Sequence, residues 1–185
     1  MAAADLDGNG SVDLALSGNV GEVGAAETLI NDGHGVFSVG EEHTVGVTSS
    51  NSVDVADLDG DDFPEIVVAN PGARGVSVLQ NRGDGTFAEP AVIVTDSARG
   101  VFLADLNGDS WVDMAVLGTS TVGGMMVLAN DRHGGFVAGE RFLAPRFDMP
   151  IAVVSGDFNE DGARDLATAG DSRPIVVWLN AGAAR

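Results

Sequence analysis

The chain of 185 residues carries 28 acidic and 9 basic side chains, and its formal net charge of −19 argues against nucleic acid or an anionic membrane surface as the main partner. Cys and Lys are absent, which excludes disulfides, thiolate zinc sites and lysine-dependent phosphate loops. No apolar run approaches the roughly 18 residues of a membrane helix, so we expect no insertion into a membrane.

The chain begins with Met1–Ala4, a short apolar piece with neither the charged start nor the apolar run of a signal peptide, so we expect none within this chain. Nine-residue acidic segments then recur and align without gaps, beginning at Asp5, Asp57, Asp105 and Asp157. A second marker of the repeat is an Asn residue that recurs with nearly the same spacing, at Asn31, Asn81, Asn130 and Asn180. Two markers in phase over four copies indicate internal repeats of about 50 residues.

Within one repeat the sequence predicts four short strands. In the second copy these are Ser52–Ala56, Glu65–Ala69, Val76–Gln80 and Phe87–Val94, and Gly-rich or acidic turns separate them. No window sustains the 3.6-residue period of an amphipathic helix. We therefore predict an all-β chain, in which each repeat is one four-stranded antiparallel blade of a β-propeller.

Four blades are expected, at about residues 1–48, 49–97, 98–147 and 148–185 of a single domain. Met1–Ala4 is interpreted as a clipped first strand, and the last blade lacks its fourth strand. Open blade edges favour association. Either the chain is a segment of a larger ring of seven or eight blades, or it associates with itself through the open edges.

Each acidic segment places side-chain oxygen donors at its first, third, fifth and ninth positions. The four donor sets are Asp5, Asp7, Asn9 and Asp13; Asp57, Asp59, Asp61 and Glu65; Asp105, Asn107, Asp109 and Asp113; and Asp157, Asn159, Asp161 and Asp165. The seventh position has no common side-chain donor and is expected to offer its backbone carbonyl, from Ser11, Phe63, Trp111 and Ala163. The second position is expected to face the core, through Leu6, Leu58, Leu106 and Phe158.

Donors that are all oxygen indicate a hard cation, and several carboxylates in one flexible loop favour calcium over magnesium. We therefore predict up to four calcium ions. An EF-hand needs Glu at the twelfth position of its loop. In this chain that position holds Leu16, Val68, Val116 and Thr168, so we reject an EF-hand. The alternative is a set of solvated acidic turns without an ion.

The sixth position of each segment is expected to need a positive φ, for which Gly is suited. Gly10 and Gly162 satisfy this expectation, whereas Asp62 and Ser110 depart from it. Since Asp tolerates this conformation better than Ser, the third loop is predicted to be the weakest of the four.

The acidic loops, followed by turns such as Asn81–Phe87, resemble the FG-GAP/VCBS repeat family, whose best-known members are the propellers of integrin α-subunits. The resemblance implies a β-propeller, commonly of seven blades, that holds calcium between the first and second strands of a blade. It carries over to the loop donors named above and to no other residue. The chain departs from the family pattern at Glu160, Asp62 and Ser110, where Gly is usual.

These observations favour a calcium-stabilised, non-catalytic propeller module of a secreted or surface protein, acting in adhesion or in carbohydrate or protein binding. Extracellular calcium modules work at roughly 10⁻⁴ to 10⁻³ M, which motivates an extracellular or cell-surface location. One alternative is part of a propeller enzyme such as a calcium-dependent polysaccharide lyase, although no catalytic residues can be named. Another is a purely structural repeat.

A glycan or protein ligand is expected on the face opposite the acidic loops, where the turns between second and third strands gather. Four arginines fall there and make that end nearly neutral: Arg74, Arg99, Arg146 and Arg173. The tripeptide Arg82-Gly83-Asp84 spells an adhesion motif, but it lies in a repeated turn, so we interpret it as turn chemistry. Trp111 is expected to pack over its own loop, and Trp178 to lie in the core.

Overall fold

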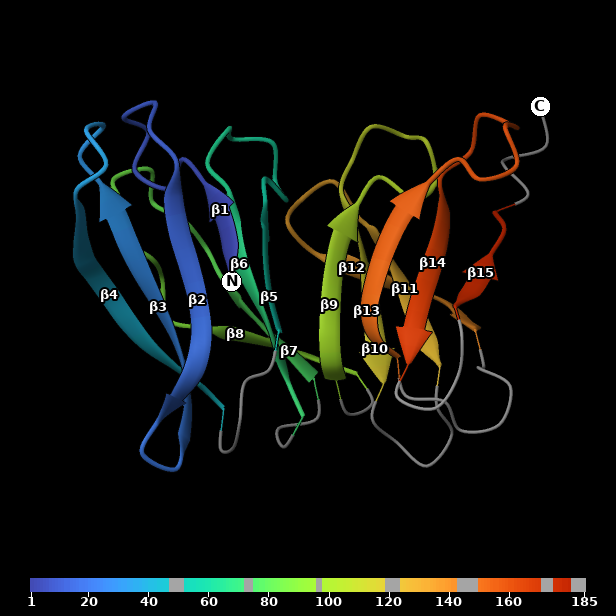
Figure 1. Ribbon diagram of the computed structural model, residues 1–185, viewed down its shortest axis with the longest axis horizontal. Coiled ribbons are helices and arrows are strands. Elements are labelled where there is room, and N and C mark those ends of the chain that lie inside the picture. The colour runs from blue at the N-terminus through green and yellow to red at the C-terminus, as the bar shows by residue number, and fades with distance from the viewer. Residues whose placement is uncertain are drawn as a thin grey trace.

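The computed structural model describes residues 1–46, 52–71, 75–95, 98–118, 124–142, 150–170 and 175–180, and all regular secondary structure in these ranges is β-strand. Four antiparallel sheets follow one another along the chain, each a meander in sequence order (Figure 1). This confirms the all-β prediction. In the described residues no helix has the length and apolarity needed to cross a membrane.

The strand bounds repeat from sheet to sheet. The first sheet contains β1 (Ala2–Ala4), β2 (Asp13–Val20), β3 (Val23–Asn31) and β4 (Phe37–Gly46). The second contains β5 (Ser52–Ala56), β6 (Glu65–Asn70), β7 (Gly75–Leu79) and β8 (Ala91–Val94). The third contains β9 (Ala98–Ala104), β10 (Asp113–Gly118), β11 (Met125–Asn130) and β12 (Phe136–Phe142). The fourth contains β13 (Pro150–Gly156), β14 (Asp165–Gly170) and β15 (Val176–Trp178).

The fourth strand of the second sheet starts later than the sequence predicted. Phe87 makes only an isolated bridge to Asn81, and β8 begins at Ala91. Pro90 lies directly before β8. Because Pro has no N–H to donate, it interrupts the ladder between the bridge and the strand.

The sheets pack face to face in the manner of propeller blades. The first strands lie beside one another, since β5 contacts both β1 and β9, and β9 contacts β13. One apolar cluster fills each interface between successive sheets. The four sheets form an open series, and the described residues close no ring. A four-stranded sheet cannot bury both of its faces alone, which explains why each sheet needs its neighbour.

The prediction that the residue at the second position of each acidic loop faces the core is correct in three repeats and wrong in the fourth. Leu6, Leu58 and Leu106 are buried, at 0%, 1% and 7% exposure, whereas Phe158 is 49% exposed. Each of the three leucines lies in the cluster shared with the following sheet. In the described residues no fifth sheet covers Phe158, so its ring remains in contact with solvent.

The acidic loops join the first and second strands of each sheet. They lie at the same end of the molecule as the turns between third and fourth strands, at the top of Figure 1. This places the loops of neighbouring sheets close enough to contact one another, and it positions the candidate site.

Candidate metal-binding loops

The four loops share one backbone conformation. Their fourth and sixth positions all have φ between 62° and 87°, at Gly8, Gly10, Gly60, Asp62, Gly108, Ser110, Glu160 and Gly162. The predicted positive φ at the sixth position is therefore confirmed in every repeat, including the two without Gly. The fourth position has the same requirement, which the sequence analysis did not state. A non-Gly residue in this region is strained by the contact between its Cβ and the backbone.

Ser110→Gly is expected to stabilise the protein by about 0.5–1 kcal/mol, because relief of left-handed strain exceeds the added flexibility of the unfolded chain. Ser110 has φ 71°. Thermal unfolding in excess calcium measures the change, expected to be a rise in Tm of roughly 1–4 °C. Ala163→Gly is the control, since Ala163 is not among the residues with positive φ and should lose stability on substitution. An unchanged or lower Tm for Ser110→Gly contradicts the strain argument.

Side-chain oxygens of each loop accept backbone N–H groups from within the same loop. The first-position carboxylate accepts the N–H of the sixth residue at 2.7, 3.0, 2.9 and 2.9 Å in the four loops. The fifth-position oxygen accepts the N–H of the seventh residue at 2.7 to 3.0 Å. These bonds curl the backbone and hold the donor side chains on one side of the loop.

Two loops bring three carboxylates together. Oxygens of Asp5, Asp7 and Asp13 lie within 4.8 Å of one another, as do those of Asp57, Asp59 and Asp61. In the part of the chain that the structure describes, these are the two groups of three or more acidic, His or Cys side chains that meet this distance. In the third and fourth loops the third-position donor is Asn, so three carboxylates do not converge there.

One buried oxygen of the first loop has no hydrogen-bond partner. Asp5 uses Oδ2 to accept the N–H of Gly10, but its Oδ1 is buried and unsatisfied. A buried, unpaired carboxylate oxygen is costly unless a donor or a cation faces it. Together with the all-oxygen donor set, this atom shows that the first loop fits a hard cation.

The ninth-position carboxylates are buried and hold each loop against its sheet. Asp13, Glu65, Asp113 and Asp165 are 0–1% exposed. In each repeat one carboxylate oxygen accepts the backbone N–H of the residue at the second position of the same loop, at 2.7 to 3.0 Å. The other accepts the N–H of the Asn marker, at 2.7 to 3.4 Å. These side chains therefore join the loop to the end of the third strand, a role that the sequence analysis did not assign.

The second loop concentrates negative charge where water is scarce. Burial, together with repulsion from nearby Asp59, raises the pKa of Glu65 to about 7. Burial also raises the pKa of Asp59, with Asp61 and Asp57 adding repulsion. Burial likewise raises the pKa of Asp113 in the third loop. A bound cation would favour the charged forms of these groups.

The chelated protein is expected to become more stable as the pH falls from 8 to 6. Glu65 has a folded-state pKa of about 7 against 4.5 for its ordinary value, so the folded state binds a proton in this range that the unfolded state does not. Stability therefore falls as pH rises through 7, with the opposite sign to an ordinary salt-bridged carboxylate. Thermal unfolding in chelator measures this difference, and Glu65→Gln should remove most of it. A Tm that is higher at pH 8 contradicts the assignment.

The third loop has a competitor for its fifth-position carboxylate. Nη2 of Arg132 lies 3.1 Å from Oδ2 of Asp109. The N–H of Trp111 and this guanidinium lower the pKa of Asp109. The pair is exposed enough to contribute little stability, but a cation in this loop would compete with Arg132. This contact agrees with the prediction that the third loop is the weakest.

The Asn markers join neighbouring sheets. Each amide donates through Nδ2 to the backbone carbonyl of the residue at the second position of the acidic loop in the preceding sheet. The pairs are Asn81 with Leu6 at 3.0 Å, Asn130 with Leu58 at 2.9 Å and Asn180 with Leu106 at 2.6 Å, and they are 72 to 75 residues apart in sequence. The same amide donates to a carbonyl within its own sheet. In the sequence these Asn residues recur with nearly the same spacing as the acidic loops. This regular spacing was the one available signal of their role.

The aromatic side chains at the seventh position contact the preceding loop. A Cβ added to Gly8 would lie 3.2 Å from the Phe63 ring, and one added to Gly60 would lie 3.0 Å from the Trp111 ring. The expectation that Trp111 packs over its own loop is therefore wrong, because the ring crosses to the loop of the preceding sheet. Trp178 is half-buried in the third cluster and packs edge-on against Phe142, near the predicted core position.

The adhesion-like tripeptide is held in its turn. Nη1 of Arg82 donates to the carbonyl of Phe87 at 2.6 Å. Gly83 has φ 76°, and a Cβ there would approach the Phe63 ring to 2.8 Å. Asp84 accepts the N–H and hydroxyl of Thr86. These contacts give each of the three residues a part in the turn.

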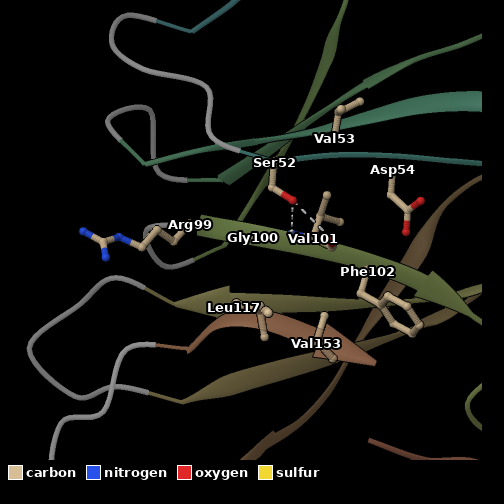
Figure 2. Close-up of a pocket in the computed structure, with 10 residues that line it drawn as sticks. Ser52, Val53, Asp54, Arg99, Gly100, Val101, Phe102, Leu117 and Val153 are labelled. Carbon is tan, nitrogen blue, oxygen red and sulfur yellow. Dashed lines mark hydrogen bonds between the residues drawn. The ribbon is translucent and has the colours of Figure 1, made fainter. Parts of the chain in front are cut away.

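A hollow of about 570 Å³ opens where the first strands of three sheets meet (Figure 2). Its lining includes Ser52 and Asp54 on β5, with Arg99 and Phe102 on β9. The N–H of Leu103 donates to the Asp54 carboxylate at 2.9 Å, and burial raises the pKa of that carboxyl. Polar groups and an aromatic ring therefore line one concave surface.

The hollow involves the starts of β5 and β9, and the acidic loops follow the ends of these strands. It therefore extends toward the face that the sequence analysis favoured for a ligand. Of the four arginines named for that face, the structure describes Arg99, whose side chain extends away from the other labelled residues in Figure 2. Arg74, Arg146 and Arg173 lie outside the described residues.

A model of the FG-GAP-like repeat matches the chain three times, at residues 5–68, 57–116 and 105–168. No curated protein matches the sequence. Among solved structures, the chain is similar to a lectin of Agrocybe aegerita described as recognising non-reducing terminal N-acetylglucosamine. The two are 28% identical with a TM-score of 0.51, and the match covers 76% of this chain and 36% of the lectin. The chain thus spans about a third of the lectin's length.

Proposed function

Because the chain belongs to the FG-GAP-like repeat family, we propose that it is a calcium-stabilised, non-catalytic propeller module that binds carbohydrate. The observation that carries the calcium proposal is the first loop, where three carboxylates converge and Asp5 keeps a buried oxygen without a partner. The similarity to a lectin supports the carbohydrate proposal. An extracellular or cell-surface location follows from a need for calcium near the millimolar range.

In each loop the side chains at positions one, three, five and nine would hold the ion, together with the backbone carbonyl of position seven. A calcium ion supplies positive charge that offsets carboxylate repulsion. The chain's own residues shape the loop. The carboxylate at the first position accepts the N–H of the sixth residue, and the carboxylate at the ninth position joins the loop to the end of the third strand. The ion's role in this proposal is structural.

The hollow at the first strands is the proposed place for a terminal sugar. Phe102 offers a ring face and Asp54 offers carboxylate oxygens that can accept hydrogen bonds, the kinds of group that bind the apolar and hydroxylated faces of a sugar. We expect Phe102→Ala to abolish binding of N-acetylglucosamine-terminated glycans measured by array and titration calorimetry. Phe37→Ala is the control, since Phe37 is an exposed aromatic at the start of β4.

The alternatives predict different outcomes of the same assays. Absence of glycan binding, with and without calcium, would favour a purely structural repeat. Release of unsaturated sugar ends from a polysaccharide would favour a lyase. Retention of glycan binding by Phe102→Ala would place the sugar elsewhere.

Self-association is proposed as a second property. The outer faces of the first and fourth sheets expose apolar side chains, among them Val39 at 69% and Leu179 at 60%. Exposed apolar faces of this kind can be buried against the blade of a second copy of the chain. Molar mass in solution with calcium present should exceed that of one chain, and a monomer at all concentrations contradicts this proposal.

A further inference from the structure

Three of the four loops contain one carboxamide that donates to a carboxylate of the same loop. Nδ2 of Asn9 donates to Asp7 at 2.9 Å, and Nδ2 of Asn159 donates to Asp161 at 2.9 Å. In the third loop Nδ2 of Asn107 lies at 3.4 Å from the ninth-position carboxylate. The second loop has carboxylates at all four donor positions and therefore has no such amide of its own.

In the second repeat the amide comes from outside the loop. Gln80 follows the last residue of β7, and its Nε2 donates to Oδ2 of Asp59 at 2.6 Å and to Oε1 of Glu65 at 3.1 Å. It precedes Asn81, so the equivalent residues of the other repeats are Ile30, Ala129 and Leu179. None of these three can donate or accept a hydrogen bond through its side chain. The contact is thus specific to the second loop.

We propose that Gln80 is an additional ligand for the divalent cation of the second loop, which makes this loop the tightest of the four. The inference rests on the proposed calcium function. Without a cation, the N–H groups of Gln80 face two carboxylates. With a cation, a half-turn of the terminal amide presents Oε1 instead, since the oxygen and nitrogen of a carboxamide occupy nearly equivalent positions.

The donor count supports this ranking. The second loop has four carboxylates at its donor positions and the carboxamide of Gln80 beside them, whereas the other loops have three carboxylates and one carboxamide at their donor positions. Three of the four carboxylates, those of Asp57, Asp59 and Asp61, converge. Calcium affinity increases with the number of charged ligands. Of the two partners of Gln80, Asp59 belongs to the three carboxylates that converge in this loop, so the amide lies beside that group.

Terbium luminescence can report on the second loop when the third loop, to which Trp111 itself belongs, is disabled by Asp105→Asn. Tb³⁺ is a hard cation that prefers oxygen ligands, and its emission is sensitised by a nearby indole. The Trp111 ring packs against Gly60 in the second loop, whereas Trp178, in the fourth sheet, packs against Phe142 of the third sheet. The Asp105→Asn protein, titrated with Tb³⁺ that is then displaced with Ca²⁺, should therefore give a signal from which Trp111→Phe removes the contribution of the second loop.

In the Asp105→Asn protein, Gln80→Leu is expected to weaken the Trp111-sensitised affinity for both ions roughly tenfold or more. Ile30→Leu, at the equivalent position of the first repeat, should leave it unchanged. If Gln80→Leu does not fold, Gln80→Ala takes its place. Unchanged or tighter binding in the Gln80 variant overturns the inference, because it means that the amide only occupies the place of the ion. Absence of Tb³⁺ and Ca²⁺ binding by the wild type overturns the proposed calcium function itself.

Discussion

Removal of calcium is expected to lower Tm by roughly 10–20 °C. An ion that binds only the folded state at 100 times its Kd contributes about 2.7 kcal/mol, so occupation of the first two loops contributes about 5 kcal/mol. For a chain of this length each kcal/mol corresponds to roughly 2–4 °C. The repulsion among Asp57, Asp59 and Asp61 provides the physical reason, since it returns when the ion leaves. Differential scanning calorimetry in calcium and in chelator measures the shift.

Two variants control the calcium experiment. Asp5→Asn keeps an oxygen that can accept the N–H of Gly10 but removes one charge from the first cluster, so the shift on chelation should become smaller. Asp32→Asn removes an acidic side chain outside the clusters and should leave the shift unchanged. An identical Tm with and without calcium in the wild type would mean that the acidic loops are solvated turns.

Asn130→Ala is expected to cost about 3–4 kcal/mol of unfolding free energy. The change leaves the carbonyls of Leu58 and Val112 without their donor, at a site where Asn130 is 6% exposed. Each buried group that loses its partner costs about 1–3 kcal/mol. The bond to Leu58 also crosses between the second and third sheets, so its loss should weaken their packing. Chemical denaturation in excess calcium gives the free energy directly.

Asn31→Ala is the matched control for this experiment. Asn31 starts the equivalent turn of the first repeat, and its Nδ2 donates to Val12 within its own sheet. Its Oδ1 accepts turn N–H groups, as that of Asn130 does. Because it is more exposed and makes no described bond to a preceding sheet, its loss should cost only about 1 kcal/mol. Equal costs at both positions would falsify the inter-sheet role.

Much of the site could be read from local sequence. The donor spacing at alternate positions and the need for positive φ at the sixth position depend on a few neighbouring residues, and both recur in all four repeats. Ser110 and Asp62 adopt this conformation without Gly, because the hydrogen bond that their N–H donates to the first-position carboxylate holds the turn. The calcium assignment itself remains a prediction.

The contacts between repeats could not be read in this way. Trp111 reaches the loop of the preceding sheet, and the amide of Asn130 reaches Leu58 across 72 residues of sequence. Gln80 enters the second loop from the end of another strand. These contacts depend on how far one sheet is offset from the next, and no local pattern encodes that offset.

The amino-acid sequence by itself determined the number of repeats, the β-strands and the placement of the acidic loops, because each follows from short-range spacing and turn chemistry. Only the tertiary structure decided which carboxylates converge, which amides join neighbouring sheets and which apolar side chains remain exposed. The physical reason is that stacking brings residues about one and a half repeats apart into hydrogen-bond distance, as Asn180 and Leu106 show at 2.6 Å.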